Sequence, residues 1–182
     1  MKKLSLRARV LTGVAAAVVA GTVGAASASA SAPAAAPAAV KTDTKNRNLQ
    51  QSTHLTLEAA TRAAQATLDA AKKENQRVSV AVVDRNGNTI LTLRGDGAGP
   101  QAYESAVKKA YTAVSWNAPT SELAKRLANA PTLKDIPGTL FLAGGAPVTA
   151  KSAPIAAIGV AGAPSGDLDE KFAQAGVATL TR

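Results

Sequence analysis

The sequence predicts an α+β fold in which helices flank one five-stranded antiparallel sheet. An alanine-rich segment with helical periodicity, residues 57–73, precedes two apolar runs joined by Asn86-Gly87. Three further apolar runs follow near the carboxyl end, separated by short turns. Strands that are joined by short turns pair antiparallel, and the helices between them cover the sheet. The predicted order of elements is αββααβββα.

Residues 1–30 are expected to be a secretory signal peptide. Four basic residues precede an apolar segment from Val10 to Val23, and Ala28-Ser29-Ala30 fits the small-x-small cleavage rule. The apolar segment is short for a membrane span, although a retained membrane anchor is the alternative. We therefore expect the mature chain to be secreted, extracellular or associated with the cell wall. Loss of the four basic residues lowers the net charge from +9 to +5. The mature chain has no dense basic stripe of the kind that nucleic-acid binding uses.

Residues 31–48 are rich in alanine and proline and then polar, so we expect a disordered tether there. The folded domain is expected to span residues 49–182. The chain contains no cysteine and one histidine, His54, and its one methionine is Met1. These counts exclude disulfides, a structural zinc site of the Cys/His type and any thiolate nucleophile.

The elements of the domain follow from local signals. Thr56 is a good N-cap for the first helix. The two strands of the hairpin are residues 78–84 and 89–93, and the second helix covers residues 102–114. Thr120 or Ser121 is expected to cap a short third helix. The apolar stripe of the first helix is predicted to consist of Leu57, Ala60, Ala64, Leu68 and Ala71.

The remaining strands are predicted at residues 139–143, 146–150 and 154–163, where apolar runs alternate with turns at Gly144-Gly145 and Lys151-Ser152. A final helix begins at Ser165 or Asp167 and ends near Leu180. This assignment places five strands in the sheet.

Seven short motifs, in one order, resemble the GlcG/HbpS-like family of haem-binding and haem-degrading domains. They are LTLEAA, VAVVDRNGN, LRGDGA, SAVKKAYTA, APTSEL, GGAPV and AAIGVAGA, and the resemblance as a whole covers roughly Leu55 to Leu180. The resemblance implies a profilin/PAS-like domain of the GlcG type that binds haem. The leader and tether are most similar to secreted members that assist a membrane sensor kinase. A homo-oligomer, up to an octamer, is implied as well.

The stretch Arg94-Gly95-Asp96 spells a cell-adhesion tripeptide, but it also fits the family pattern Arg-x-Asp-Gly-Ala. In that pattern Gly95 occupies a variable slot, and Arg94, Asp96 and Gly97 belong to a ligand-pocket or assembly loop. A phosphate-binding loop is disfavoured, because no Gly-Lys-Ser/Thr ending is present. The alternative is local: Arg94 and Asp96 form an ion pair, or cap the next helix.

A haem iron takes His, Cys, Met or Tyr as an axial ligand. Among these the mature chain offers His54, Tyr103 and Tyr111. The alternatives are a solvated histidine and tyrosines at the rim of the core. The resemblance also allows ligation through a hydroxyl, for which Thr120 is a candidate, although helix capping explains it equally well.

Other side chains have candidate roles toward haem or iron. Basic residues can bind the propionates, and the tryptophan can stack on the porphyrin or fill the core. The acidic cluster Asp167, Asp169 and Glu170 can hold iron ions through oxygen ligands, or favour a helix amino terminus. For every basic candidate the alternative is an ordinary surface charge. The basic candidates are Arg94, Lys108, Lys109 and Lys151, and the tryptophan is Trp116.

We therefore expect a secreted haem-binding protein that senses or buffers haem and iron, with haem and the sensor kinase as partners and no nucleic acid. Side chains suited to catalysis are scarce, so binding is favoured over enzymatic activity. Any activity would be oxidative haem degradation, carried by the bound group itself. The alternatives are a haem-degrading enzyme that releases iron and a domain that binds a small organic acid.

Overall fold

The computed structural model describes residues 43–181. The folded unit begins at Asn46. The predicted signal peptide, residues 1–30, and residues 31–42 of the predicted tether lie outside the described residues. Residues 43–54 are exposed and include one 3₁₀ turn. In the part of the chain that the structure describes, no helix combines the length and the apolar character needed to cross a membrane.

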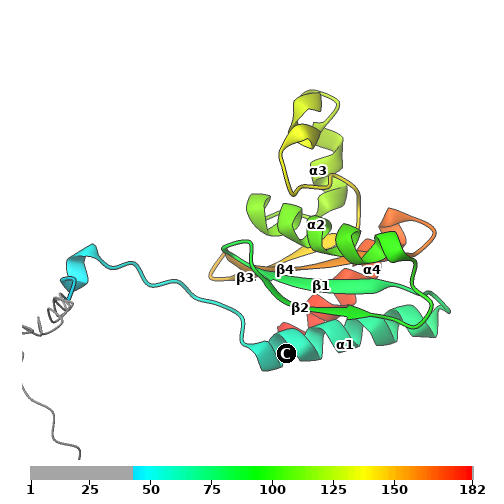
Figure 1. Cartoon of the computed structure of the whole chain (residues 1–182), viewed down its shortest axis with the longest axis horizontal. Helices are drawn as coiled ribbons and strands as arrows, with labels where there is room; N and C mark the ends of the chain where they lie inside the picture. Colours follow the sequence, from blue (N-terminus) through cyan, green and yellow to red (C-terminus); the bar gives the residue numbers. More distant parts are fainter. Residues whose placement is uncertain (1–42, 182) are drawn as a thin grey trace, which may run out of the picture. The chain divides into compact units, whose positions relative to one another are not determined.

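The folded unit contains one antiparallel sheet of four strands, accompanied by four α-helices (Figure 1). In chain order the elements are η1 (Asn46–Asn48), α1 (Leu57–Lys73), β1 (Ser79–Asp84), β2 (Thr89–Arg94), α2 (Pro100–Trp116), α3 (Thr120–Arg126), η2 (Pro131–Asp135), β3 (Gly145–Ala150), β4 (Ala153–Ala161), α4 (Gly166–Val177) and η3 (Ala178–Leu180). The α+β class is confirmed, with four strands in place of five.

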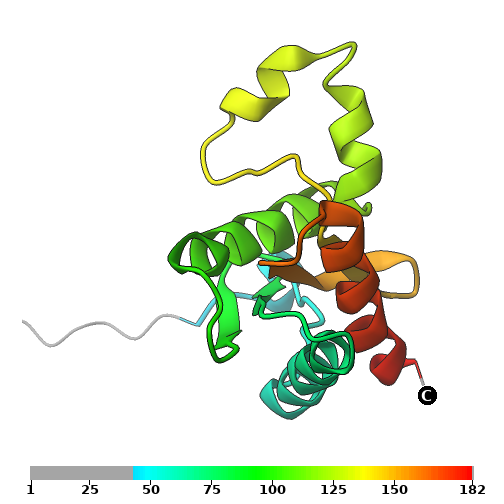
Figure 2. The same cartoon turned by 90° about the vertical axis from the view of Figure 1, so that its right-hand side faces the viewer.

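The sheet has the strand order β2-β1-β4-β3, and each neighbouring pair is antiparallel. Helix α2 covers one face, whereas α1 and α4 cover the other (Figures 1 and 2). The strands β2 and β3 form the two edges. The hairpin between β1 and β2 turns at Gly87, which adopts a φ of +86°.

Small residues on one face of β4 bring α2 close to the sheet. Ala157 and Ala161 contact the α2 side, and between them lies Gly159. A Cβ atom at Gly159 would meet the carbonyl oxygen of Ala106 and would lie 2.6 Å from the amide nitrogen of Ala110. The backbone of α2 therefore rests directly on β4, which explains why alanine rather than a larger residue fills this layer.

Helix α1 begins as predicted, because the Thr56 side chain accepts a hydrogen bond from the Ala59 amide at 3.2 Å. Its buried stripe passes through Ala60, Ala64 and Ala71. The prediction for Leu57 was wrong: this side chain is 63% exposed at the first position of the helix. A residue in the first turn has no preceding turn beside it, so periodicity alone does not decide whether it is covered.

The fifth strand, predicted at residues 139–143, does not form. The amide of Leu140 donates instead to the Thr112 hydroxyl at 2.8 Å, and Phe141 packs edge-on against Trp116, with ring centroids 5.2 Å apart. These apolar side chains belong to a small separate cluster with Leu123, beneath α3. Phe141 is the residue of the run that fills this cluster, whereas Leu142 is 57% exposed, and the backbone of the run is not paired in the sheet.

Candidate functional site

The side chain of Arg94, at the start of the loop between β2 and α2, is hydrogen-bonded to the backbone of that loop. The Arg94 guanidinium donates through Nε and Nη2 to the carbonyl oxygen of Ala98, at 3.2 and 2.7 Å. The alternatives for Asp96 are not seen among the described residues: α2 has no side-chain cap, and no ion pair joins Asp96 to Arg94. Asp96 is exposed, and its carboxylate is available to a ligand.

Gly95 is held against the first strand. Its amide donates to the Val78 carbonyl oxygen at 2.9 Å, and an added Cβ would lie 2.8 Å from that same oxygen. The slot that the family pattern treats as variable is therefore restricted to glycine by a backbone contact in this chain. This steric demand also accounts for the adhesion-like tripeptide.

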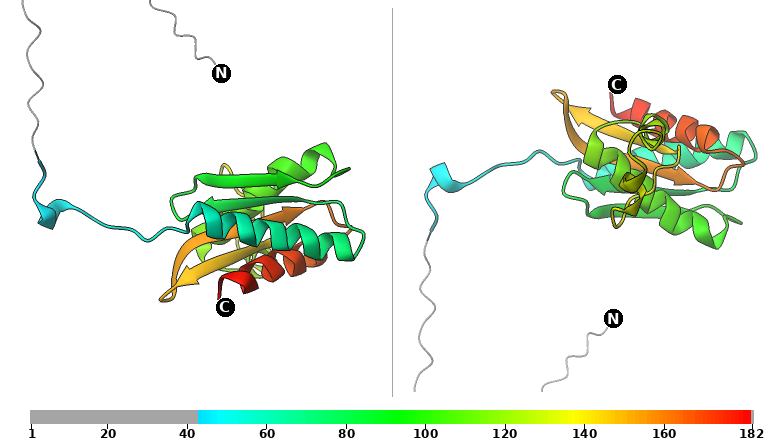
Figure 3. Two further views of the ribbon diagram at one scale, coloured as in Figure 1. Left: turned by 90° about the horizontal axis from the view of Figure 1, so that it is seen from below. Right: turned by 90° about the horizontal axis from the view of Figure 1, so that it is seen from above.

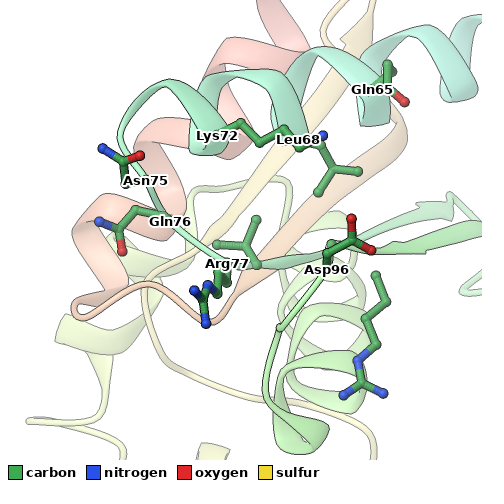
Figure 4. Close-up of a pocket in the computed structure, with 10 residues that line it drawn as sticks. Gln65, Leu68, Lys72, Asn75, Gln76, Arg77 and Asp96 are labelled. Atoms are coloured by element: carbon green, nitrogen blue, oxygen red, sulfur yellow. The ribbon is translucent and has the colours of Figure 1, made fainter.

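A groove of about 430 Å³ lies between the second half of α1, the start of β1 and this loop. Figure 4 shows Leu68 and Lys72 extending from α1, and Asp96 facing them from the loop. We call it the arginine groove, and it is lined by Gln65, Leu68, Lys72, Asn75, Gln76, Arg77, Val78, Arg94, Gly95 and Asp96. Three cationic side chains and one carboxylate give it a net charge of +2, which favours an anionic ligand.

Arg77 is the residue of this groove that sequence reasoning missed. It follows α1 and precedes β1 outside every quoted motif. Its side chain lies over Gly97, where an added Cβ would be 2.9 Å from Cδ and 3.3 Å from Nη1. Gly97, with a φ of +77°, thus provides the space that Arg77 occupies. Gly97 in the motif LRGDGA was the one sequence signal for Arg77, because a glycine leaves room for a large side chain beside it.

His54 lies away from the arginine groove. Its Nε2 is 2.6 Å from the Ser52 hydroxyl oxygen, and its Nδ1 is 3.8 Å from Oδ2 of Asp84. Asp84 ends β1 at the hairpin turn, whereas Ser79 and Arg94 pair at the other end of the same strands. The separation along β1 is roughly 16 Å at the usual strand rise. His54 and Arg94 therefore do not share one groove within a single chain.

Asp84 is the ionised group at that turn. Burial raises the pKa of its carboxyl, but hydrogen bonds from Asn88 and Asn86, together with the nearby His54, outweigh burial and hold the pKa below its ordinary value. The amides of Asn86 and Asn88 donate to Oδ1 at 2.8 and 2.9 Å. The carboxylate therefore organises the hairpin turn.

Tyr103 and Lys108 lie together on the outer side of α2. Tyr103 is 45% exposed, and its phenolic oxygen accepts a hydrogen bond from the Thr92 hydroxyl at 3.1 Å. The Lys108 ammonium is 3.8 Å from the Glu104 carboxylate, one helical turn away. Both residues line a shallow groove of about 300 Å³ beside β2, separate from the arginine groove.

Thr120 is a structural residue in this chain, and not a surface hydroxyl. Its side chain is fully buried, and Oγ1 accepts a hydrogen bond from the Gly145 amide at 2.7 Å. The N-cap of α3 is Pro119, so the predicted capping role of Thr120 is wrong. The hydroxyl ties the start of α3 to β3, and it is not accessible to a ligand in this conformation.

Lys109 and Asp169 form a buried ion pair between α2 and α4. Their Nζ and Oδ2 atoms are 2.8 Å apart, and Nζ also donates to the Val160 carbonyl oxygen at 3.0 Å. Burial raises the pKa of the Asp169 carboxyl, and this effect exceeds the opposing influence of Lys109. Both side chains are buried and bonded within the protein, so Lys109 is not exposed to bind propionates.

Glu170 is buried and accepts hydrogen bonds from the amide and hydroxyl of Ser121, at 2.9 Å for the amide. Asp167 is exposed, unlike Asp169 and Glu170. Within residues 43–181, no group of three His, Cys, Asp or Glu side chains is placed to hold a metal ion. The three predicted iron ligands are thus not brought together, because successive positions on α4 face different neighbours.

The remaining candidates have ordinary structural positions. Trp116 packs in the small cluster with Phe141, as the alternative for the tryptophan expected. Tyr111 of α2 is half-buried and packs against the cluster that contains Val83, close to Gly87 and Gly138. Lys151 is exposed in the turn between β3 and β4, with a φ of +50°. From the predicted set, the structure therefore places only Arg94 and Asp96 in the lining of the arginine groove, with Gly97 next to Asp96 against the Arg77 side chain. Tyr103 and Lys108 line another groove.

Comparisons with known proteins agree with this architecture. A double mutant of HbpS from Streptomyces reticuli, with two glutamates changed to aspartate, is 74% identical in its crystal structure; the match covers 79% of this chain and 99% of that one, with a TM-score of 0.78. An uncharacterised 15.0 kDa protein from the dhaT–dhaS intergenic region of Citrobacter freundii is 34% identical over 118 residues, which is 62% of this chain and 83% of that protein.

A third comparison shows the fold alone. The crystal structure of a PduOC:haem complex is 24% identical and has a TM-score of 0.64, covering 69% of this chain and 94% of that one.

The family model described as "Haem degrading protein HbpS-like" matches residues 55–178, from the start of α1 to the end of α4. The chain therefore belongs to the HbpS-like family of haem-degrading proteins.

Proposed function

We propose that this chain binds haem in the arginine groove and holds the propionates through Lys72, Arg77 and Arg94. The observation that carries the proposal is the net positive charge of this groove in a member of a haem-related family. Arg94 uses Nε and Nη2 on the Ala98 carbonyl oxygen, so its Nη1 remains for a carboxylate. Charge-assisted bonds from guanidinium to carboxylate are among the strongest that a surface site can form.

The lining residues fit the propionates better than they fit the iron. The half-buried Leu68 supplies apolar contact for one side of a porphyrin, whereas the Val78 side chain is buried in the core. The lining includes no histidine, cysteine, methionine or tyrosine, which are the usual protein ligands of haem iron. We therefore expect the propionates and the ring, rather than an iron–protein bond, to dominate affinity. Bound haem would supply redox chemistry, whereas Lys72, Arg77 and Arg94 would only orient it.

A series of three porphyrins tests this proposal on the unmodified protein. Hemin and metal-free protoporphyrin IX share the propionates, whereas the dimethyl ester of protoporphyrin IX lacks their charge. Tryptophan fluorescence quenching and absorbance titration should give dissociation constants for hemin and protoporphyrin IX within about threefold of each other, and a value roughly tenfold weaker or more for the ester. Equal binding of the ester would reject the propionate contacts. Loss of binding on removal of iron would show that an axial ligand outside the groove dominates.

Haem degradation is the second candidate, and the description of the matching family favours it. Addition of ascorbate to the hemin-loaded protein in air separates the two functions. A persistent Soret band indicates binding without turnover. Loss of the band together with chelatable iron indicates degradation. Free hemin at the same concentration is the control for breakdown without protein.

We also propose that the chain is exported, assembles as a homo-oligomer and assists a membrane sensor kinase, with iron ions as a further ligand. The basic, apolar and small-residue pattern of residues 1–30 supports export. The kinase, the octamer and the iron ions rest on the family resemblance. Mass spectrometry of culture supernatant should find an amino terminus near Ser31, and an intact Met1 in the membrane fraction would contradict export.

A further inference from the structure

The fold gives no structural role to the carboxylate of Asp96. This residue is exposed in the loop between β2 and α2. Within residues 43–181 the carboxylate has no ion-pair partner, and the amino terminus of α2 has no side-chain cap. Loop residues that a rigid scaffold positions at the surface are the ones that most often contact ligands. The groove that Asp96 lines is thus where its charge can act.

The backbone on both sides of Asp96 is fixed by hydrogen bonds. Gly95, which precedes it, donates its amide to the Val78 carbonyl oxygen at 2.9 Å. Ala98, two residues after it, donates its amide to the Gly95 carbonyl oxygen at 3.0 Å. The carbonyl oxygen of Ala98 also accepts both hydrogen bonds from the Arg94 guanidinium. Because the loop is held on both sides of Asp96, the carboxylate is kept at the groove.

Asp96 lies across the groove from helix α1. Seen from below, α1 lies beside β2 and ends near the loop that follows β2 (Figure 3). Figure 4 shows Leu68 and Lys72 on that helix, with the Asp96 side chain directed toward α1 from the loop. Among the described residues that line the arginine groove, Asp96 is the one acidic side chain. A ligand in the groove therefore meets this carboxylate on one side and α1 on the other.

The charges of the groove match a ligand with two carboxylates. Lys72, Arg77 and Arg94 contribute the positive charges, and the negative charge of Asp96 reduces the net charge to +2. Two propionates neutralise this charge, whereas four carboxylates leave negative charge uncompensated in a site that already contains a carboxylate. Binding sites gain specificity by placing a repulsive charge against the wrong ligand. Asp96 supplies such a charge.

We propose that Asp96 is the specificity-determining residue of the arginine groove, and that it selects tetrapyrroles with two carboxylates over those with four. Haem and protoporphyrin IX belong to the first class. Coproporphyrin III belongs to the second class, because each of its four pyrrole rings carries one propionate. When two of these propionates bind the cations of the groove, Asp96 repels the other two. This inference rests on the proposed function, because it concerns the ligand of the same groove.

The ratio of two dissociation constants tests the role of Asp96. Tryptophan fluorescence quenching at low salt gives the constants for coproporphyrin III and protoporphyrin IX, and their ratio is then compared between protein variants. We expect this ratio to fall about threefold or more in Asp96→Asn, because the repulsive charge is gone. Asp96→Glu keeps the charge and should keep the wild-type ratio. Asp135→Asn, an exposed residue outside the groove, is the control for the change in net charge.

Salt and a second variant separate the possible outcomes. At about 0.5 M salt the difference between wild type and Asp96→Asn should shrink, because exposed charges are screened. An unchanged ratio in Asp96→Asn at low salt, or an equal fall in Asp135→Asn, would overturn the role of Asp96. Lys72→Ala/Arg77→Ala should weaken the binding of protoporphyrin IX. If it does, failure of the ratio test concerns Asp96 alone; if it does not, the proposed function fails and this inference with it.

Discussion

Lys109 and Asp169 meet at 2.8 Å with side chains that are 5% and 4% exposed, and so join α2 to α4 at the end of β4. We predict that Lys109→Met lowers the free energy of unfolding by about 3–5 kcal/mol, because it leaves a buried carboxylate without its partner. The double variant Lys109→Met/Asp169→Leu should lose much less. Urea unfolding followed by circular dichroism measures all three proteins.

A matched control separates burial from mere proximity. Lys171 and Glu74 are 2.7 Å apart, but their side chains are 63% and 39% exposed. Lys171→Met should change the free energy of unfolding by less than about 1 kcal/mol. Equal losses in Lys109→Met and Lys171→Met would contradict the assignment of the buried pair to a structural role.

The hairpin turn should make the fold sensitive to acid. The pKa of Asp84 is lower in the folded chain than its ordinary value of 3.8, so its contribution to stability is present above pH 3.8 and is lost as the pH falls through the folded value. Asp84→Asn should cost about 1 kcal/mol at neutral pH and progressively less below pH 3.8. The exposed Asp135→Asn is the control. A difference between Asp84→Asn and wild type that stays constant down to pH 2 would contradict this account.

Thr120 should affect folding and leave the haem spectrum unchanged. Its hydroxyl is the acceptor for the Gly145 amide, and Thr120→Val leaves that buried donor unpaired at a cost of about 1–3 kcal/mol. Thr120→Ser keeps the hydroxyl and should recover most of the loss. If Thr120→Val shifts the Soret band of the hemin complex while the fold remains stable, the hydroxyl acts as a haem ligand after all.

Gly95 should prove intolerant of a side chain. An alanine Cβ would be 2.8 Å from the Val78 carbonyl oxygen, so Gly95→Ala must displace the loop that carries Arg94 and Asp96. We expect hemin affinity to fall, whereas the family pattern alone expects no effect at this slot. Gly138→Ala lies outside the groove, and its φ of +79° also strains an alanine, so it is the control for a strained glycine replacement that does not touch the groove. Unchanged hemin affinity in Gly95→Ala would show that the loop shift does not reach the ligand.

Local signals predicted the elements well, because their causes are local. Thr56 caps α1 as the sequence predicted, and α4 is capped by Ser165, one of the two predicted starts, since each cap involves an amide three residues away. The apolar run around Phe141 was misassigned, because a short apolar run is compatible with a strand and with a loop that fills a cluster. Only the position of Trp116, across the chain, decides between them.

The site was less predictable because its neighbours are distant in sequence. The Thr120 hydroxyl is hydrogen-bonded to Gly145 and Glu170. Lys109 is paired with Asp169, which lies sixty positions later in the sequence. Arg77 carries no motif, and it enters the groove because the strand pairing brings the start of β1 beside the loop after β2. The residue types in the sequence identified candidate ligands. Which of them are exposed at a groove depends on burial and on contacts between segments that are distant in the sequence.

The most direct test of the central claim is a hemin titration of Lys72→Ala/Arg77→Ala against Lys73→Ala/Arg126→Ala. Both double variants remove two positive charges, but only the first removes them from the arginine groove, since Lys73 and Arg126 are exposed outside it. The account predicts that the dissociation constant for hemin rises roughly tenfold or more in the first variant and stays within about twofold of wild type in the second. Equal affinities in the two variants would contradict haem binding by this groove.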